Sequence, residues 1–148
     1  MIVADASIAT AWYLEPDNIV AQAAFAEVLE QGVAVPGNFI AEIAQSLLRA
    51  VRLSRITADE MQVAVAGLSS LEITVEPTPP SSLVSLATRH SLSSYDAGYL
   101  YVAKLRGTQL ATIDAQLTRA AKTEGCLWTP PPGGRGATEK RFSLLLAG

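Results

Sequence analysis

Short runs of apolar, often branched side chains recur along the chain, separated by stretches in which apolar residues have helical spacing. Runs of this length and composition are typical of strands buried in a sheet. Because strands and helices alternate five times, we expect a mainly parallel central sheet of about five strands, covered by helices on both faces. The sequence therefore predicts an α/β fold with strands at 1–4, 33–35, 71–75, 109–113 and 126–128.

Start and stop signals delimit the helices between these strands. We expect Asp17 to cap the second helix, and Thr57 with Glu60 has the spacing of a capping box. The segment 97–105 is apolar on nearly every side, which indicates a buried helix with Tyr99 and Tyr101 in the core. The predicted helices begin near residues 7, 17, 38, 57, 79, 93 and 114.

Charge and cysteine content exclude several classes of site. The chain has 11 Lys and Arg against 14 Asp and Glu, a net charge of -3, and therefore no general basic surface for nucleic acid. Its one cysteine, Cys126, excludes an internal disulfide, and with a single histidine, His90, zinc chemistry is nearly excluded. The first basic residue is Arg49, and no apolar run approaches a membrane span. We expect a cytoplasmic protein without a membrane partner.

The composition changes after Trp128. Three successive prolines, Pro130 to Pro132, and several glycines come after it. We therefore predict one domain over residues 1–128 and a Pro/Gly-rich C-terminal extension over 129–148. The extension is expected to be a mobile tail. The alternative is that its apolar segment 142–146 docks on the domain, a second subunit or a partner.

Four carboxylates stand at the edges of the predicted elements. Asp5 follows the first strand and Asp114 the fourth, and the carboxyl ends of parallel strands meet at one edge of a sheet. Asp96 opens a helix at that same edge, and Glu42 lies about one turn into its helix. Each acid also has a structural explanation, since Asp5 and Asp114 suit N-caps, Asp96 suits a first helical turn and Glu42 suits a solvated face.

The segments that carry these acids are Met1-Ile-Val-Ala-Asp-Ala-Ser7, Pro36-Gly-Asn-Phe-Ile-Ala-Glu42, Tyr95-Asp-Ala-Gly-Tyr-Leu-Tyr-Val-Ala103 and Leu110-Ala-Thr-Ile-Asp114. In this order and spacing they resemble the PIN-domain nucleases. The nearest likeness is to the VapC-type toxins of bacterial type II toxin–antitoxin systems. The resemblance covers about residues 1–128 and implies a PIN-like three-layer α/β/α sandwich.

The resemblance also implies a site and its partners. It makes Asp5, Glu42, Asp96 and Asp114 the catalytic acids of a pocket for Mg²⁺ or Mn²⁺, supported by the hydroxyls of Ser7 and Thr112. It further implies RNA as substrate, a cognate antitoxin protein as inhibitor and a homodimer. Gln45 stands where members of the family often carry Asn.

Such a pocket suits phosphodiester hydrolysis. Crowded carboxylates repel one another, and a divalent cation removes that penalty while activating a water without a histidine base. His90 is then not required, and we expect it at a helix end. Arg49 and Arg52, on the same helix line as Glu42, are candidate contacts to RNA phosphates, with a solvated helix face as the alternative. Tyr95 is a candidate for stacking on a base.

Two classes of function stay open at this point. The first is a metal-dependent endoribonuclease acting as a toxin, or a PIN nuclease without a toxin role. The second is a non-catalytic α/β interaction module whose acids are helix caps. In the second case, replacing Asp5 or Asp96 lowers stability by about 1 kcal/mol and Mg²⁺ leaves the melting temperature unchanged.

Overall fold

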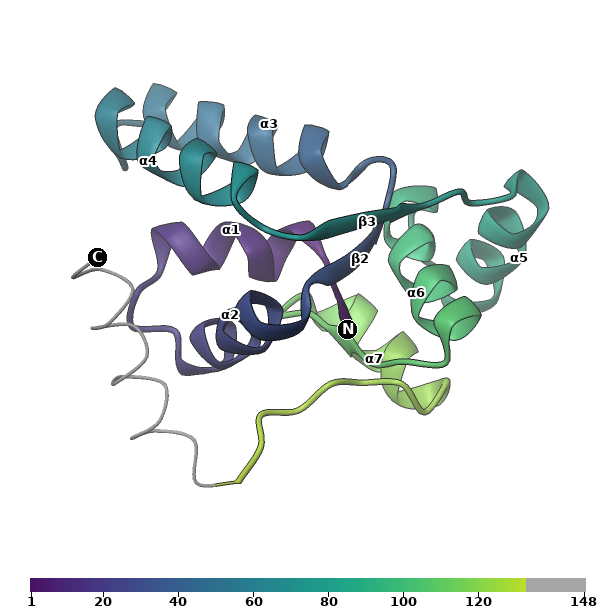
Figure 1. Cartoon of the computed structure of the whole chain (residues 1–148). Coiled ribbons are helices and arrows are strands. Elements are labelled where there is room, and N and C mark those ends of the chain that lie inside the picture. Colours follow the sequence, from purple (N-terminus) through teal and green to yellow (C-terminus); the bar gives the residue numbers. More distant parts are fainter. Residues whose placement is uncertain (133–148) are drawn as a thin grey trace.

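The centre of the computed structural model, which describes residues 1–132, is a sheet with the strand order β3-β2-β1-β4 (Figure 1). Every pairing is parallel, and Val3 of β1 lies opposite Ala34 on one side and Leu110 on the other. Of the extension predicted over 129–148, residues 133–148, which include the apolar segment 142–146, lie outside the described residues. The strands are β1 Ile2–Ala4, β2 Val33–Pro36, β3 Ile73–Glu76 and β4 Leu110–Ala111.

The sheet has four strands where the sequence predicts about five. In the described part of the chain, the last apolar segment forms one isolated parallel bridge, between Leu127 and Leu110. Two backbone hydrogen bonds fix it there: Leu110 N–H donates to Cys126 C=O at 2.7 Å, and Trp128 N–H donates to Leu110 C=O at 2.9 Å. The prolines at 130–132 come soon after, and proline has no N–H with which to continue a ladder.

The helices of residues 1–132 follow their sequence signals with one exception. Thr57 and Glu60 form the expected capping box. Asn18, and not Asp17, caps the second helix, because the helix begins at the next residue and the Asn18 Oδ1 accepts the Ala21 N–H at 3.0 Å. None of these helices is long and apolar enough to cross a membrane. They are α1 Ala6–Leu14, α2 Ile19–Gln31, α3 Phe39–Arg52, α4 Ala58–Ser69, α5 Pro80–His90, α6 Ser94–Arg106 and α7 Ala115–Thr123.

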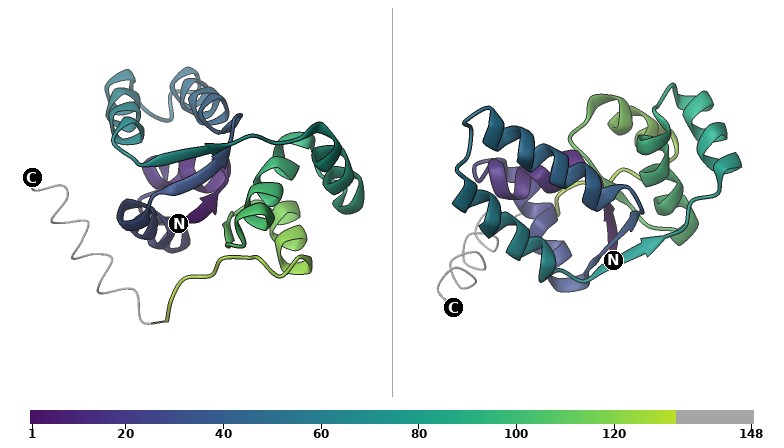
Figure 2. Two further views of the ribbon diagram at one scale, coloured as in Figure 1. Left: turned by 45° about the vertical axis from the view of Figure 1, so that its right-hand side comes forward. Right: turned by 90° about the horizontal axis from the view of Figure 1, so that it is seen from above.

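The helices cover the sheet from both faces (Figures 1 and 2). On one face α1 packs against α2, and the hairpin of α3 and α4 lies against α1. On the other face α6 contacts β1, β2 and β4, and it packs in turn against α5 and α7. This is the α/β/α arrangement that the sequence predicts.

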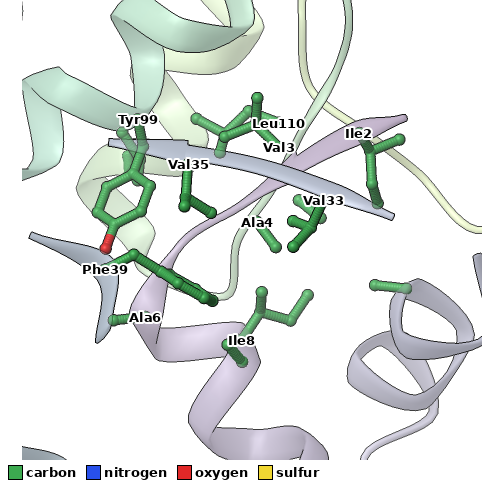
Figure 3. Packing of buried hydrophobic residues seen from close by; sticks show 14 of the residues in the cluster. Ile2, Val3, Ala4, Ala6, Ile8, Val33, Val35, Phe39, Tyr99 and Leu110 are labelled. Atoms are coloured by element: carbon green, nitrogen blue, oxygen red, sulfur yellow. The ribbon is translucent and has the colours of Figure 1, made fainter. Parts of the chain in front are cut away.

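The core runs along the central strands and reaches the edge where they end (Figure 3). Val3, Val35 and Leu110 have no exposed surface. Tyr99 of α6 is fully buried, as the sequence predicts, and packs edge-on to Phe39 of α3, with ring centroids 6.5 Å apart. This contact brings α3 and α6, the two helices that carry predicted site acids, together at the carboxyl edge of the sheet.

Candidate active site

Asp5 lies at the end of β1 and is 3% exposed. Its Oδ1 accepts the N–H of Ile8 at 3.1 Å and thereby caps α1, as the structural explanation of this residue predicts. Its two oxygens also accept the Ser7 hydroxyl, at 2.7 and 2.9 Å, and Oδ2 accepts the Thr112 hydroxyl at 2.9 Å. The cap therefore explains only part of the environment, since two hydroxyls orient the same carboxylate.

Asp114 follows β4 and caps α7, with its Oδ1 accepting the Leu117 N–H at 2.8 Å. Its own N–H donates to the Thr112 hydroxyl oxygen at 3.0 Å, and that hydroxyl in turn donates to Asp5. Thr112 therefore links the residues at the ends of β1 and β4. The expectation that Asp5 and Asp114 emerge at one edge of the sheet is confirmed.

Glu42 is half-buried in the first turn of α3, which differs from a residue on a solvated face. Its Oε1 accepts the Tyr99 hydroxyl at 3.2 Å and the Asn38 side-chain amide. Burial, together with the charges of Glu42 and Asp5, raises the pKa of Tyr99, which keeps its hydroxyl protonated as a donor. The core of the domain thus holds Glu42 at the same edge as Asp5.

Asp96 occupies the first turn of α6, where its N–H donates to the Ser93 hydroxyl of the cap at 3.1 Å. Burial raises the pKa of Asp96, and the negative charges of Asp114 and Glu42 raise it further. Burial also raises the pKa of Asp5 to about 6, against its own hydrogen bonds, with a contribution from Asp96. Asp96 therefore interacts electrostatically with each of the other three acids, although the four come from separate elements.

The four acids are not drawn into a ligand cluster in this structure. Within residues 1–132, no three His, Cys, Asp or Glu side chains gather closely enough to hold a metal ion. In the same part of the chain, none of the four forms an ion pair with a basic side chain. Carboxylate oxygens are the ligands that Mg²⁺ and Mn²⁺ prefer, and uncompensated repulsion is what a divalent cation relieves. The donor chemistry therefore fits such a cation.

The predicted RNA contacts lie on exposed surface outside this group of acids. Arg49 is exposed and lies two turns beyond Glu42 on the same face of α3, about 10 Å along the axis. Arg52 is exposed on the last turn and rotated away from that line. Tyr95 is 63% exposed and precedes Asp96 in the first turn of α6.

Three further residues shape the site and have no assigned role in the sequence analysis. Asn38 and Tyr99 both donate to Glu42. A Cβ at Gly98 would lie 3.2 Å from Pro36, so glycine lets α6 approach the end of β2. Two signals were available: Asn38 and Glu42 have the i, i+4 spacing of neighbours on a helix, and Tyr99 follows Asp96 by one turn.

The comparisons with known proteins agree with this arrangement. Residues 2–123 match the family model of the PIN domain, and this span contains all four acids. The crystal structure of PAE2754 from Pyrobaculum aerophilum is similar to the chain with a TM-score of 0.59 and 25% sequence identity, covering 82% of this chain and 79% of that one. No curated protein matches the chain. PIN domains are a nuclease superfamily whose members generally use divalent metal ions. With most of its length matched by that model, the chain belongs to the PIN-domain family.

Proposed function

We propose that this protein is a metal-dependent endoribonuclease that hydrolyses RNA phosphodiester bonds and acts as the toxin of a toxin–antitoxin pair. The observation that carries the proposal is the repulsion at Asp96, whose pKa is raised by burial, by Asp114 and by Glu42. Helix capping explains Asp5 and Asp114. It does not explain why α3 and α6 add two more carboxylates to the same edge without a basic partner in residues 1–132.

The chain's own residues prepare the site for hydrolysis. The residues that would hold Mg²⁺ or Mn²⁺ are Asp5, Glu42, Asp96 and Asp114, and the ion would supply an activated water and stabilise charge on the leaving oxygen. The hydroxyl of Thr112, like that of Ser7, fixes the orientation of the Asp5 carboxylate. The buried setting of Asp5 excludes bulk water and strengthens each electrostatic interaction there.

The proposed RNA path leads from the four acids along α3. Arg49 and Arg52 are exposed and have no ion pair within residues 1–132, which leaves both guanidinium groups free to contact phosphates beside the cleaved bond. Tyr95 is exposed next to Asp96 and offers a ring for stacking on an unpaired base.

The toxin role and its partners rest on the likeness of the four sequence motifs to VapC-type toxins. The proposal includes a homodimer and a cognate antitoxin protein that covers the acids until the toxin is released. The experiment for this part is induced expression in a bacterial host. We expect wild-type protein to arrest growth and Asp96→Asn protein at equal abundance to allow it. If cells grow normally while the wild-type protein cleaves RNA, the toxin role is wrong and the protein is a PIN nuclease with another role.

The nuclease itself is tested by cleavage of end-labelled single-stranded RNA. We expect cleavage with Mg²⁺ or Mn²⁺, none with a chelator, and a loss of at least about 100-fold in Asp5→Asn and Asp96→Asn. Asp17→Asn is the matched control, because Asp17 is an exposed acid in the turn after α1.

Metal-induced stabilisation separates the nuclease from the interaction module. Mn²⁺ is expected to raise the melting temperature of the wild type and of Asp17→Asn, but not of Asp96→Asn. Full activity in both site variants, or a melting temperature indifferent to Mn²⁺ in the wild type, would leave the interaction module as the better description.

A further inference from the structure

Glu42 is held through one of its two carboxylate oxygens. Oε1 accepts two hydrogen bonds, from the Tyr99 hydroxyl at 3.2 Å and from the Asn38 side-chain amide. Within residues 1–132, Oε2 has no hydrogen bond. Two donors on the same oxygen fix the plane of the carboxylate and leave its second oxygen available.

The donor from α6 is set rigidly in the core. Tyr99 is fully buried, and its ring packs edge-on to Phe39 at the start of α3. The backbone N–H of Ala6 hydrogen-bonds to the Tyr99 hydroxyl, which donates its own proton to Glu42. Figure 3 shows the hydroxyl oxygen on the side of Phe39 and Ala6. Tyr99 therefore connects the backbone next to Asp5 with the carboxylate of Glu42.

The donor from the start of α3 is used in an unusual way. Asn38 occupies the N-cap position, where asparagine normally accepts a backbone N–H, yet its side chain makes no capping hydrogen bond. Its amide donates to Glu42 instead. A Cβ at Gly98 would lie 3.6 Å from the Asn38 Oδ1, so α6 also approaches this side chain closely. The Asn38 side chain therefore orients Glu42 and does not cap α3.

We infer that Tyr99 and Asn38 are positioning residues that hold Glu42 by Oε1 and present Oε2 to a divalent cation shared with the other acids. This inference rests on the proposed function. It goes beyond that function by assigning the two donors and by distinguishing the two oxygens of one ligand. Outer hydrogen bonds of this kind orient a ligand before the ion arrives, and losing one typically weakens metal binding by about 10- to 100-fold.

The test is Mn²⁺ titration of metal-stripped protein by calorimetry, together with RNA cleavage. Tyr99→Phe removes one hydroxyl, and Tyr101→Phe is its matched control, because Tyr101 lies on the same helix and its hydroxyl has no hydrogen bond within residues 1–132. We expect Tyr99→Phe to weaken Mn²⁺ binding by about 10-fold or more and Tyr101→Phe to bind as the wild type does. The KM for RNA at saturating Mn²⁺ is expected to stay unchanged, while kcat at limiting Mn²⁺ falls and recovers as Mn²⁺ is raised.

Asn38→Ala is a second variant, and it changes a side chain that is not fully buried. It removes the other donor without removing a helix cap, and the same loss of Mn²⁺ affinity is expected with an unchanged melting temperature in the absence of metal. If the wild type binds Mn²⁺ and cleaves RNA while both variants match it, the positioning role is wrong and the nuclease stands. If the wild type neither binds Mn²⁺ nor cleaves, the proposed function fails, and the inference fails with it.

Discussion

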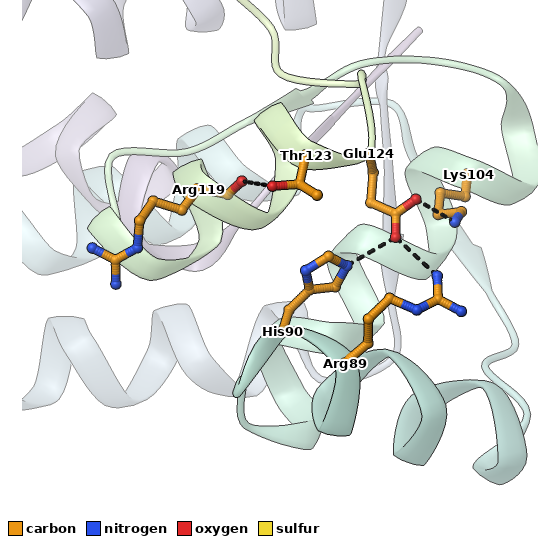
Figure 4. A network of polar contacts seen from close by, with 6 residues as sticks. All are labelled: Arg89, His90, Lys104, Arg119, Thr123 and Glu124. Atoms are coloured by element: carbon orange, nitrogen blue, oxygen red, sulfur yellow. Dashed lines mark hydrogen bonds and ion pairs between the residues drawn. The ribbon is translucent and has the colours of Figure 1, made fainter.

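Asp5 at the end of β1 and Glu124 after α7 are both carboxylates with little exposed surface, yet their pKa values move in opposite directions. Burial raises the pKa of Asp5 to about 6. The pKa of Glu124 is lowered to about 2, chiefly by hydrogen bonds from Lys104 and His90 and also by Arg89. The distances to these three basic side chains are 2.6, 2.8 and 3.0 Å (Figure 4).

The difference separates a carboxylate whose charge is compensated by basic side chains from one whose charge, within residues 1–132, is not. Glu124 joins the C-terminal end of α7 to Arg89 and His90 at the end of α5 and to Lys104 of α6, and its charge is fully compensated. His90 ends α5, which confirms the expectation that it lies at a helix end. Asp5 has hydroxyl and backbone donors but no ion pair in the described residues. Under the proposed function, its charge would be compensated by a divalent cation.

The largest expected effect is the pH dependence of stability that Asp5 causes in metal-free protein. Its pKa is raised from 3.8 to about 6 on folding, so the unfolded chain releases this proton first as pH rises. The folded state therefore loses stability between pH 3.8 and about 6, by about 3 kcal/mol in all, and the loss persists above that range. Urea unfolding of wild type and Asp5→Asn at pH 4 and 7 measures it. The wild type should lose more stability than the variant over this range, and equal losses would contradict the prediction.

Glu124→Gln is expected to have the next largest effect, with the opposite pH window. The lowered pKa means that Glu124 stabilises the fold above pH 4.5 and that this contribution is lost as pH falls toward about 2. At pH 7 we expect a loss of about 1 to 2 kcal/mol, because three basic groups lose one charged partner. Thermal or urea unfolding checks this, with Glu72→Gln at an exposed position as control. Equal losses in the two variants would show that the cluster does not brace α5, α6 and α7.

Most of the fold could be predicted because strands and helix caps depend on short stretches of chain. The buried strands and the capping box at Thr57 are each visible within a few residues. The prediction of a fifth strand was wrong because a strand there would need pairing beyond Trp128. Two ladder hydrogen bonds form, and the prolines that follow end the segment. The prediction that Asp17 caps α2 was wrong because Asp and Asn are almost equally good N-cap residues and stand side by side here. The helix begins at Ile19, which makes Asn18 the N-cap.

In the candidate site, the placement of the acids was predictable, but the contacts that orient them were not. The order of strands in a parallel sheet places Asp5 and Asp114 at one edge whatever the details of packing. The Tyr99 donor to Glu42 depends on how closely α6 meets α3, which no local pattern specifies. The same holds for Glu124, whose partners Arg89 and Lys104 lie 35 and 20 residues away along the chain.

The smallest expected effects come from two arginines that differ as the two carboxylates do: one forms an ion pair and, among the described residues, the other does not. Arg89 is engaged by Glu124, whereas Arg49 is exposed on the face of α3 that carries Glu42. Arg89→Gln should lower stability by less than about 1 kcal/mol and leave RNA binding unchanged, because its side chain is 56% exposed and the ion pair is screened.

Arg49→Gln should leave stability unchanged and weaken RNA binding instead. If the guanidinium contacts one phosphate of a single strand, the slope of log affinity against log salt concentration should fall by about 0.7. Binding of a labelled RNA to metal-free protein at several salt concentrations measures this without cleavage. A changed slope for Arg89→Gln and none for Arg49→Gln would move the RNA path from α3 to the α5 side of the molecule. It would also give the Glu124 cluster a functional role, because a residue that braces the fold would then be one that meets the substrate.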